Sequence, residues 1–136
     1  MEIVTDLRIL NQVSEPVTEF PVDFELIKEM KRLSRKGCGI SAIQLGVPKQ
    51  ILLIWKQFKW KADVIVNPKV IAVSDETVTL AETCLSRPDI TAIKTRPVSI
   101  TIEAQTQEGK PFTATYKYFY ARVLSHELDH LKGVTI

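Results

Sequence analysis

The chain has 136 residues, the length of one domain, and we expect residues 1–136 to form a single unit. Its composition of 45% hydrophobic and 25% charged residues excludes a fibrous or disordered protein. The formal charge of +2 is too small to indicate nucleic-acid binding. The sequence contains neither a signal-like N-terminus nor an apolar stretch long enough to span a membrane, so we expect a cytoplasmic protein without membrane or nucleic-acid partners.

The first third of the chain predicts an arm followed by a helix. Residues 1–22 contain two prolines and are expected to form an extended arm and a turn. Asp23 is a good helix N-cap, and the apolar period of residues 24–36 predicts a helix that ends at Gly37. One face of this helix should pack on a sheet.

The rest of the chain predicts strands and then a second helix. Runs of β-branched and aromatic residues predict strands at 51–55, 64–66, 69–73, 77–81, 90–93 and 98–104. Residues 107–110 are typical of a hairpin turn, which would pair the last of these strands with a strand at 112–118. Residues 119–132 return to a helical period. The pattern predicts an α+β fold with antiparallel strands around one central helix.

The second helix carries the sequence HExxH, formed by His126, Glu127 and His130, and it contains the only two histidines of the chain. On a helix, the i, i+4 spacing puts both imidazoles on one face, where they can share one metal ion with Glu127 beside its open position. The alternative is a polar helix face with two surface histidines. Apolar residues on both sides of the helix indicate that the two imidazole rings are buried, and a buried imidazole needs a hydrogen-bond partner or a metal ion.

A catalytic metal site of this kind needs a third protein ligand and leaves a fourth position for water. Six residues follow His130, so the third ligand must come from upstream. Cys84 is the better of the two cysteines because it follows a predicted strand that could face the helix, whereas Cys38 lies between two glycines. Both thiols should be reduced in a cytoplasmic protein. Without the HExxH sequence, Cys84 would equally fit a buried core thiol.

The segment GCGISAIQ at residues 37–44 has two interpretations. Its glycines fit a helix stop and a permissive loop position. They would also let a substrate backbone approach closely, and the amide of Gln44 can donate to a developing oxyanion.

In this order, GCGISAIQ, ETCLS and SHELDHLKG resemble the three motifs of the peptide deformylases, usually written GxGLAAxQ, EGCLS and QHExDHLxG. The resemblance extends over essentially the whole chain and implies one catalytic domain. It implies a metallohydrolase that removes the N-formyl group from the N-terminal formyl-methionine of newly made polypeptides, with formylmethionyl peptides and nascent chains as partners. The implied cofactor is one divalent metal, usually Fe²⁺, with Zn²⁺, Ni²⁺ or Co²⁺ able to occupy the site.

Carried onto matching positions, the resemblance assigns roles to individual residues. The implied metal ligands are Cys84, His126 and His130. Glu127 would be the general base and acid, which is the role that proton transfer to a leaving amine requires. The Gln44 side chain and the Leu85 backbone N–H would form the oxyanion hole.

The family also implies where a substrate lies. Its backbone would pair with Cys38, Gly39 and Thr83, and its methionine side chain would enter an apolar pocket. Cys38, Phe119 and Val123 are the pocket candidates, with ordinary core packing as the alternative for Phe119 and Val123.

Four residues depart from the family motifs. Thr83 replaces a glycine, Ser41 replaces an alanine, and Ser125 replaces the glutamine before the first histidine. Arg122 is expected to point toward the cleft, where many relatives carry an apolar residue, and to alter substrate preference.

The sequence stops at Ile136, where bacterial relatives continue into a further helix. Since that helix helps the family dock near the ribosomal exit, ribosome docking is not expected, as in compact virus-encoded or organelle-type relatives. A virus-encoded protein would work in the host cytoplasm, and an organelle is the other location.

Two other functions remain open at this stage. One is an HExxH peptidase of another kind, and the other is a non-catalytic relative that keeps the metal as a structural element. Residues 55–61 interleave aromatics with lysines and could stack on RNA, but a basic hairpin tip is the preferred interpretation.

Overall fold

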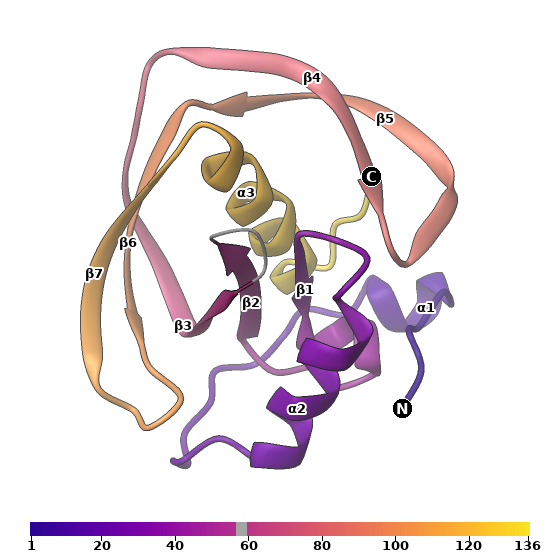
Figure 1. The fold of residues 1–136 in the computed structure, drawn as a ribbon, viewed down its shortest axis with the longest axis vertical. Coiled ribbons are helices and arrows are strands. Elements are labelled where there is room, and N and C mark those ends of the chain that lie inside the picture. The colour runs from indigo at the N-terminus through magenta and orange to yellow at the C-terminus, as the bar shows by residue number, and fades with distance from the viewer. Residues whose placement is uncertain (57–59) are drawn as a thin grey trace.

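The structure is a computed structural model that describes residues 1–56 and 60–136 (Figure 1). Among these residues, the helical segments are α1 (Leu7–Leu10), α2 (Phe24–Leu33), the 3₁₀ turn η1 (Ala42–Leu45) and α3 (Phe119–Leu131). The strands are β1 (Gly39–Ser41), β2 (Ile51–Lys56), β3 (Lys61–Val73), β4 (Thr77–Cys84), β5 (Arg87–Pro97), β6 (Ser99–Gln105) and β7 (Pro111–Lys117). No helix within the described ranges has both the length and the apolar character needed to cross a membrane.

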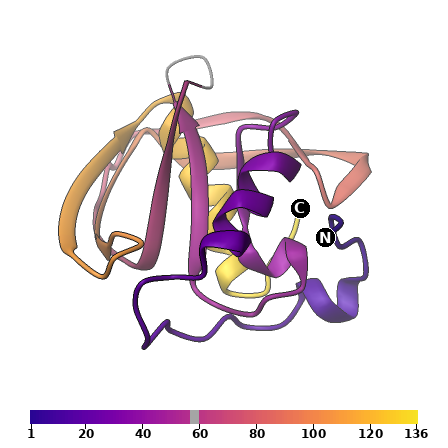
Figure 2. The ribbon, with the colours of Figure 1, turned by 60° about the horizontal axis from the view of Figure 1, so that its bottom comes forward.

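The strands form two antiparallel sheets around α3. One sheet has the order β1-β2-β3-β6-β7, and the other consists of β4 and β5 alone. Figures 1 and 2 show α3, in yellow, enclosed between the larger sheet and the β4–β5 hairpin, with α2 on the other side of β2. The predicted α+β fold, with antiparallel strands around the HExxH helix, is confirmed.

Strand β2 is buried on both faces, which explains its uninterrupted apolar sequence. Its residues Ile51, Leu53 and Trp55 belong to a core cluster shared with α2 and η1. Leu52 and Ile54 point the other way, into a second cluster shared with α3 and strands β3, β6 and β7. The sheet thus places α3 against a fully apolar surface, and the predicted packing of the first helix on a sheet is confirmed.

Three local predictions were wrong. The arm is not wholly extended, because the Asp6 side chain accepts a hydrogen bond from the Arg8 backbone N–H and begins the short helix α1. Helix α2 ends at Leu33 rather than at Lys36, because the Ser34 hydroxyl donates to the Met30 carbonyl oxygen and provides the C-cap.

Strand β3 is the third case, since it is continuous where two strands were predicted. Asn67 has a φ of 52° and the register with β6 shifts between Val66 and Lys69, so a bulge takes up the turn-like Asn-Pro pair without ending the strand. The predicted hairpin between β6 and β7 is confirmed, with Gly109 at a φ of 90°.

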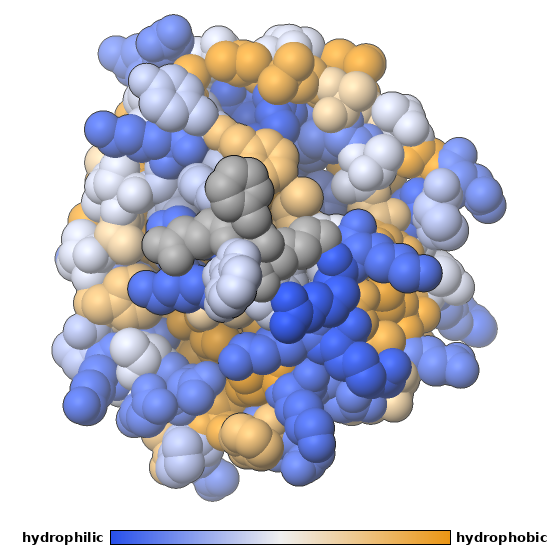
Figure 3. Space-filling model, viewed as in Figure 1, coloured by the Kyte–Doolittle hydropathy of each residue, from blue (hydrophilic) through white to orange (hydrophobic). Residues whose placement is uncertain are grey.

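The β4–β5 hairpin is longer than predicted and covers one side of α3. Strand β4 continues to Cys84, which pairs with Arg87 across the tip. Apolar side chains lie along the outer rim in Figure 3, where Figure 1 places β4 and β5. Leu80 of β4 and Ile93 of β5 are both exposed. Strands β2 and β3 pair as far as Lys56 and Lys61, and residues 57–59 of the predicted basic tip lie outside the described residues.

Candidate metal centre

Three potential metal ligands meet between the hairpin and the central helix. Cys84 ends β4, and His126 and His130 lie one turn apart on α3. Their ligand atoms all lie within 4.8 Å of one another, and the Cys84 Sγ is 3.3 Å from the His130 Nε2. The exposed fractions of the three residues are 6%, 9% and 0%. Residues 42 positions apart in sequence are therefore brought to one enclosed point.

This donor set fits one divalent cation. A thiolate and two imidazoles are the ligands that borderline metals prefer, and three protein ligands leave one position for water or substrate. The Nδ1 of His126 is occupied by the Glu82 Oε1 at 3.2 Å, which leaves the Nε2 free to bind metal. The Nδ1 of His130 is buried without a partner among the described residues.

Glu82 contacts the ring of His126 on the side away from the potential metal position. The sequence analysis gave this residue no role. Its carboxylate accepts two hydrogen bonds from Arg96, both at 2.9 Å, and one from Arg122. Burial raises the pKa of Glu82, but the hydrogen bonds from Arg96 and His126 outweigh it and lower that pKa to about 2. Glu82 lies two residues before Cys84, so the two side chains share one face of β4, and this spacing was the available signal.

Negatively charged groups around His126 favour the protonated form of its ring when no metal ion is bound. Burial disfavours the charged form, but the Cys84 thiol, Glu127 and Glu82 outweigh it and raise the pKa of His126 to about 9. The same negative surroundings favour a bound cation.

Glu127 lies beside the ligands and is 4% exposed. Burial raises its pKa to about 7, which suits a group that both accepts and donates a proton near neutral pH. The Ser41 Oγ lies 3.1 Å from the Glu127 Oε1 and 3.0 Å from its backbone oxygen. The motif departure at Ser41 therefore supplies a hydroxyl partner for this carboxyl group.

Gly39 is required by the close approach of β1 to α3. A Cβ at this position would lie 2.9 Å from Val123 Cγ1 and 3.1 Å from the Glu127 Oε2. Packing alone thus demands glycine here, whatever approaches from the cavity.

The Gln44 amide is fixed in orientation by two hydrogen bonds. Its Oε1 accepts from the Ser41 backbone N–H at 2.9 Å, and its Nε2 donates to the Ser86 Oγ at 3.1 Å. The same Nε2 is 3.8 Å from the Cys84 Sγ, so the donor points at the centre. The turn η1 holds this side chain fully inside the protein.

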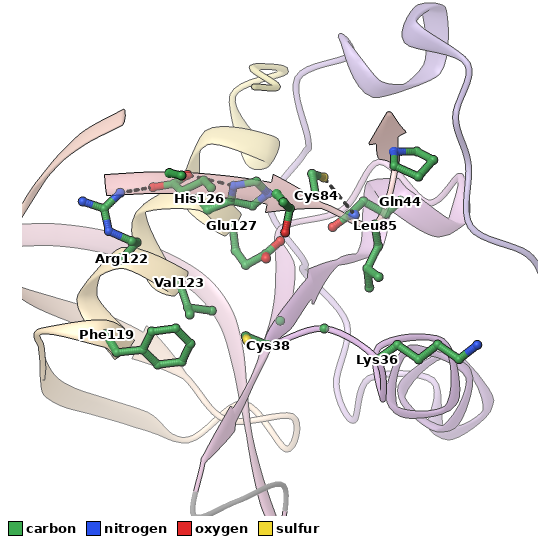
Figure 4. A pocket seen from close by; sticks show the side chains of 16 residues that line it. Lys36, Cys38, Gln44, Cys84, Leu85, Phe119, Arg122, Val123, His126 and Glu127 are labelled. Carbon is green, nitrogen blue, oxygen red and sulfur yellow. Dashed lines mark hydrogen bonds and ion pairs between the residues drawn. The ribbon is translucent and has the colours of Figure 1, made fainter. Parts of the chain in front are cut away.

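A cavity of about 440 Å³ opens beside the three potential ligands (Figure 4). The sequence-predicted residues that line it are Cys38, Gly39, Gln44, Thr83, Cys84, Leu85, Phe119, Arg122, Val123, His126 and Glu127. His130 lies outside this lining, completely buried behind it. Val123 lines the cavity and also belongs to the second core cluster, whereas Phe119 lines the cavity and is about half exposed.

Comparison with known proteins assigns the family. A family model described as polypeptide deformylase matches residues 1–136. The chain belongs to the peptide deformylase family. A peptide deformylase from Rhizobium meliloti strain 1021 is 37% identical over 132 residues, which cover 93% of this chain and 76% of the relative.

Solved peptide deformylases share the fold. The enzyme of the Vibrio parahaemolyticus bacteriophage VP16T, in complex with actinonin, aligns with a TM-score of 0.90 at 29% identity and covers 100% of both chains. A class I type b peptide deformylase from Acinetobacter baumannii, bound to Met-Ala-Ser, aligns with a TM-score of 0.91 at 25% identity over 99% of this chain and 96% of that one.

Family membership settles the reaction class. Peptide deformylases are metallohydrolases that remove the formyl group from nascent peptides, and this chain is an enzyme of that family. The alternatives of an unrelated HExxH peptidase and a non-catalytic relative are thereby set aside.

Proposed function

We propose that Cys84, His126 and His130 hold one divalent cation and that Glu127 moves the protons of formyl hydrolysis. The observation that carries this assignment is the convergence of a thiol and two imidazoles from β4 and α3 beside a buried carboxyl group, at the wall of a cavity. When bound, the cation supplies Lewis-acid chemistry, polarising a carbonyl and making water more acidic.

Glu127 accepts the proton of the water that attacks the formyl carbon and passes it to the nitrogen of the leaving amine. Burial raises the pKa of Glu127 above the ordinary range of a carboxyl group, which favours both transfers near neutral pH. The Gln44 Nε2, already oriented by Ser41 and Ser86, and the Leu85 backbone N–H stabilise the oxyanion that develops on the formyl oxygen.

The substrate of this proposal is a formyl peptide whose backbone lies along the residues that flank the cavity. Cys38 and Gly39 on one side and Thr83 on the other supply backbone groups, and the first side chain points toward Phe119 and Val123. The Met-Ala-Ser complex of the Acinetobacter relative supports a short peptide with methionine first.

The bound metal in this proposal is Fe²⁺, with Zn²⁺, Ni²⁺ and Co²⁺ as replacements that the same donors accept. We place the reaction in the cytoplasm, since the thiols of Cys38 and Cys84 are both free and a reducing compartment keeps them so.

Anaerobic purification with metal analysis, combined with hydrolysis of formyl-Met-Ala-Ser, tests the proposal. The expected result is about one metal ion per chain and release of formate without cleavage of internal peptide bonds. A Cys84→Ala variant that keeps full metal content would contradict the ligand assignment.

A further inference from the structure

The two carboxyl oxygens of Glu127 have different surroundings. The Oε1 lies 3.1 Å from the Ser41 Oγ, and Ser41 is completely buried and is not one of the cavity-lining residues. The Oε2 lies 3.1 Å from the position that a Cβ on Gly39 would take, and Gly39 and Glu127 both line the cavity. One oxygen is therefore on the protein side of the carboxyl group, and the other is on the cavity side.

The oxygen on the cavity side has no hydrogen-bond partner among the described residues. It is also not one of the fully buried side-chain atoms that lack a partner in this part of the chain, so it keeps some accessible surface. Because Glu127 as a whole is 4% exposed and lines the cavity, that access comes from the cavity (Figure 4). An oxygen that accepts the proton of a water molecule must have such access.

The Ser41 hydroxyl provides the one hydrogen bond that the Glu127 carboxyl group receives from the described residues. The last torsion of a glutamate side chain has a broad energy minimum, so the carboxyl group needs a partner to keep one orientation. The hydroxyl has a single proton and a second possible acceptor, the Glu127 backbone oxygen at 3.0 Å. The carboxylate is the stronger acceptor of the two because it is charged.

Ser41 has a second possible role, which the test must separate from the first. It is the N-cap of η1 and forms a capping box with Gln44. Removing the hydroxyl could therefore disturb Gln44, although the Gln44 Oε1 accepts from the Ser41 backbone N–H, which no substitution by alanine removes.

We propose that Ser41 is a positioning residue whose hydroxyl holds the Oε1 of Glu127, so that the Oε2 faces the substrate in the cavity. This inference rests on the proposed function, in which Glu127 moves the protons of the reaction. The peptide deformylase motif has alanine at this position, so the hydroxyl is a feature of this chain rather than of the motif. For the same reason, Ser41→Ala should fold.

A double-mutant cycle tests the proposal. Formyl-Met-Ala-Ser hydrolysis is measured for the wild type, Ser41→Ala, Glu127→Gln and the double variant, with each rate divided by the metal content of the sample. In the wild-type background, Ser41→Ala should lower kcat about tenfold and change KM by less than about twofold, because a hydrogen bond to a charged group is lost. In the Glu127→Gln background, the same substitution should change kcat by less than about twofold.

A role of Ser41 through Gln44 or through packing gives a different result. Equal losses of kcat in the two backgrounds, or a change in KM alone, would overturn the proposal. Ser125→Ala is the matched control, because it removes a buried hydroxyl of α3 that has no partner among the described residues. Its effect on kcat should be the same in both backgrounds.

Crystal structures of metal-loaded wild type and Ser41→Ala provide a readout that does not need catalysis. The Glu127 carboxyl group should occupy one position in the wild type, and it should leave that position or occupy more than one in the variant. The same single position in both proteins would overturn the inference. Wild-type enzyme that does not hydrolyse formyl-Met-Ala-Ser would instead overturn the proposed function, and the two crystal structures would still decide whether Ser41 positions Glu127.

Discussion

At the scale of the residue, Glu127 combines deep burial with a position beside the three proposed metal ligands. Glu127→Gln conserves its volume but removes the proton acceptor, so kcat should fall about 100-fold or more. Metal content per chain should stay at the wild-type level, because Glu127 is not one of the three converging ligands. Formate release and metal analysis on the same sample measure both, and a variant with the wild-type rate would refute the assignment.

A similar loss of activity is expected when the Gln44 amide, the proposed donor to the oxyanion, is removed. Gln44→Leu removes an oriented donor that is needed most in the transition state, so we expect kcat to fall about 100-fold with a smaller change in KM. Ser86→Ala is the matched control, since it removes only the acceptor of the Gln44 Nε2 and leaves the Ser41 contact intact. A Gln44→Leu variant that keeps the wild-type kcat would contradict this role.

The residues with the strongest local signals could be predicted from the sequence. Two histidines four residues apart around a glutamate carry their geometry in their spacing, and the structure places them as that spacing requires. Glu82 could not be ranked among 16 acidic residues, because its partners Arg96 and Arg122 are 14 and 40 positions away. Contacts between side chains that are far apart in the chain produce no periodic pattern in the sequence.

At the scale of the element, hydrogen bonds between side chains connect the β4–β5 hairpin to α3. Glu82 on β4 accepts from His126 and Arg122 of α3, and Arg96 on β5 donates to Asp129 of α3 at 2.7 Å. The proposed metal ligands come from the same two elements, so this cluster fixes Cys84 relative to both histidines.

Glu82→Gln should therefore weaken metal binding by about 10- to 100-fold, the usual effect of losing the outer partner of a ligating histidine. The neutral amide also removes the carboxylate that pairs with Arg122, whereas Arg96 keeps its ion pair with Asp129. Competition with a chromogenic chelator measures the affinity, and Glu103→Gln on the exposed side of β6 is the control. Equal affinity in Glu82→Gln and the wild type would contradict this link.

A second link, between β7 and β3, predicts a pH dependence of stability. The Tyr116 hydroxyl donates to the Asp63 Oδ2 at 2.9 Å, and burial, together with the charge and hydrogen bond of Asp63, raises the pKa of Tyr116 far above its ordinary 10.0. The folded protein therefore holds this proton more tightly than the unfolded chain. Its contribution is complete below pH 10 and decreases as the pH rises above that value.

The free energy of unfolding should thus decrease above this pH more steeply in the wild type than in Tyr116→Phe, by up to about 1.4 kcal/mol per pH unit. At neutral pH the variant should lose about 1 kcal/mol with the hydrogen bond. Urea denaturation at several pH values measures both, and parallel curves for the two proteins would exclude the effect.

Element types were more predictable than their extents. Helix α3 and the β6–β7 hairpin carry a clear period and a turn signal, and both are confirmed. Strand β1 and the turn η1 were not predicted, because residues 39–45 owe their shape to packing between α2, β2 and α3 rather than to local propensity. The bulge at Asn67 likewise depends on the register with β6.

At the scale of the whole molecule, a bound cation would join two parts of the fold that, among the described residues, belong to separate sheets. Cys84 belongs to the two-stranded sheet, whereas both histidines lie on the helix that packs on the five-stranded sheet. Because the unfolded chain does not hold these ligands together, the metal stabilises only the folded state. The gain is about 3–4 kcal/mol at metal concentrations of roughly 100 to 1,000 times the dissociation constant.

Removing the metal with a chelator should therefore lower the melting temperature, and adding it back should restore the original value. Glu127→Gln should keep the full shift, whereas Cys84→Ser should lose most of it because a hydroxyl is a much poorer ligand for such ions. Thermal denaturation with and without metal measures the difference. A shift of the same size in Cys84→Ser would mean that the cation stabilises the protein elsewhere and does not join the hairpin to the helix.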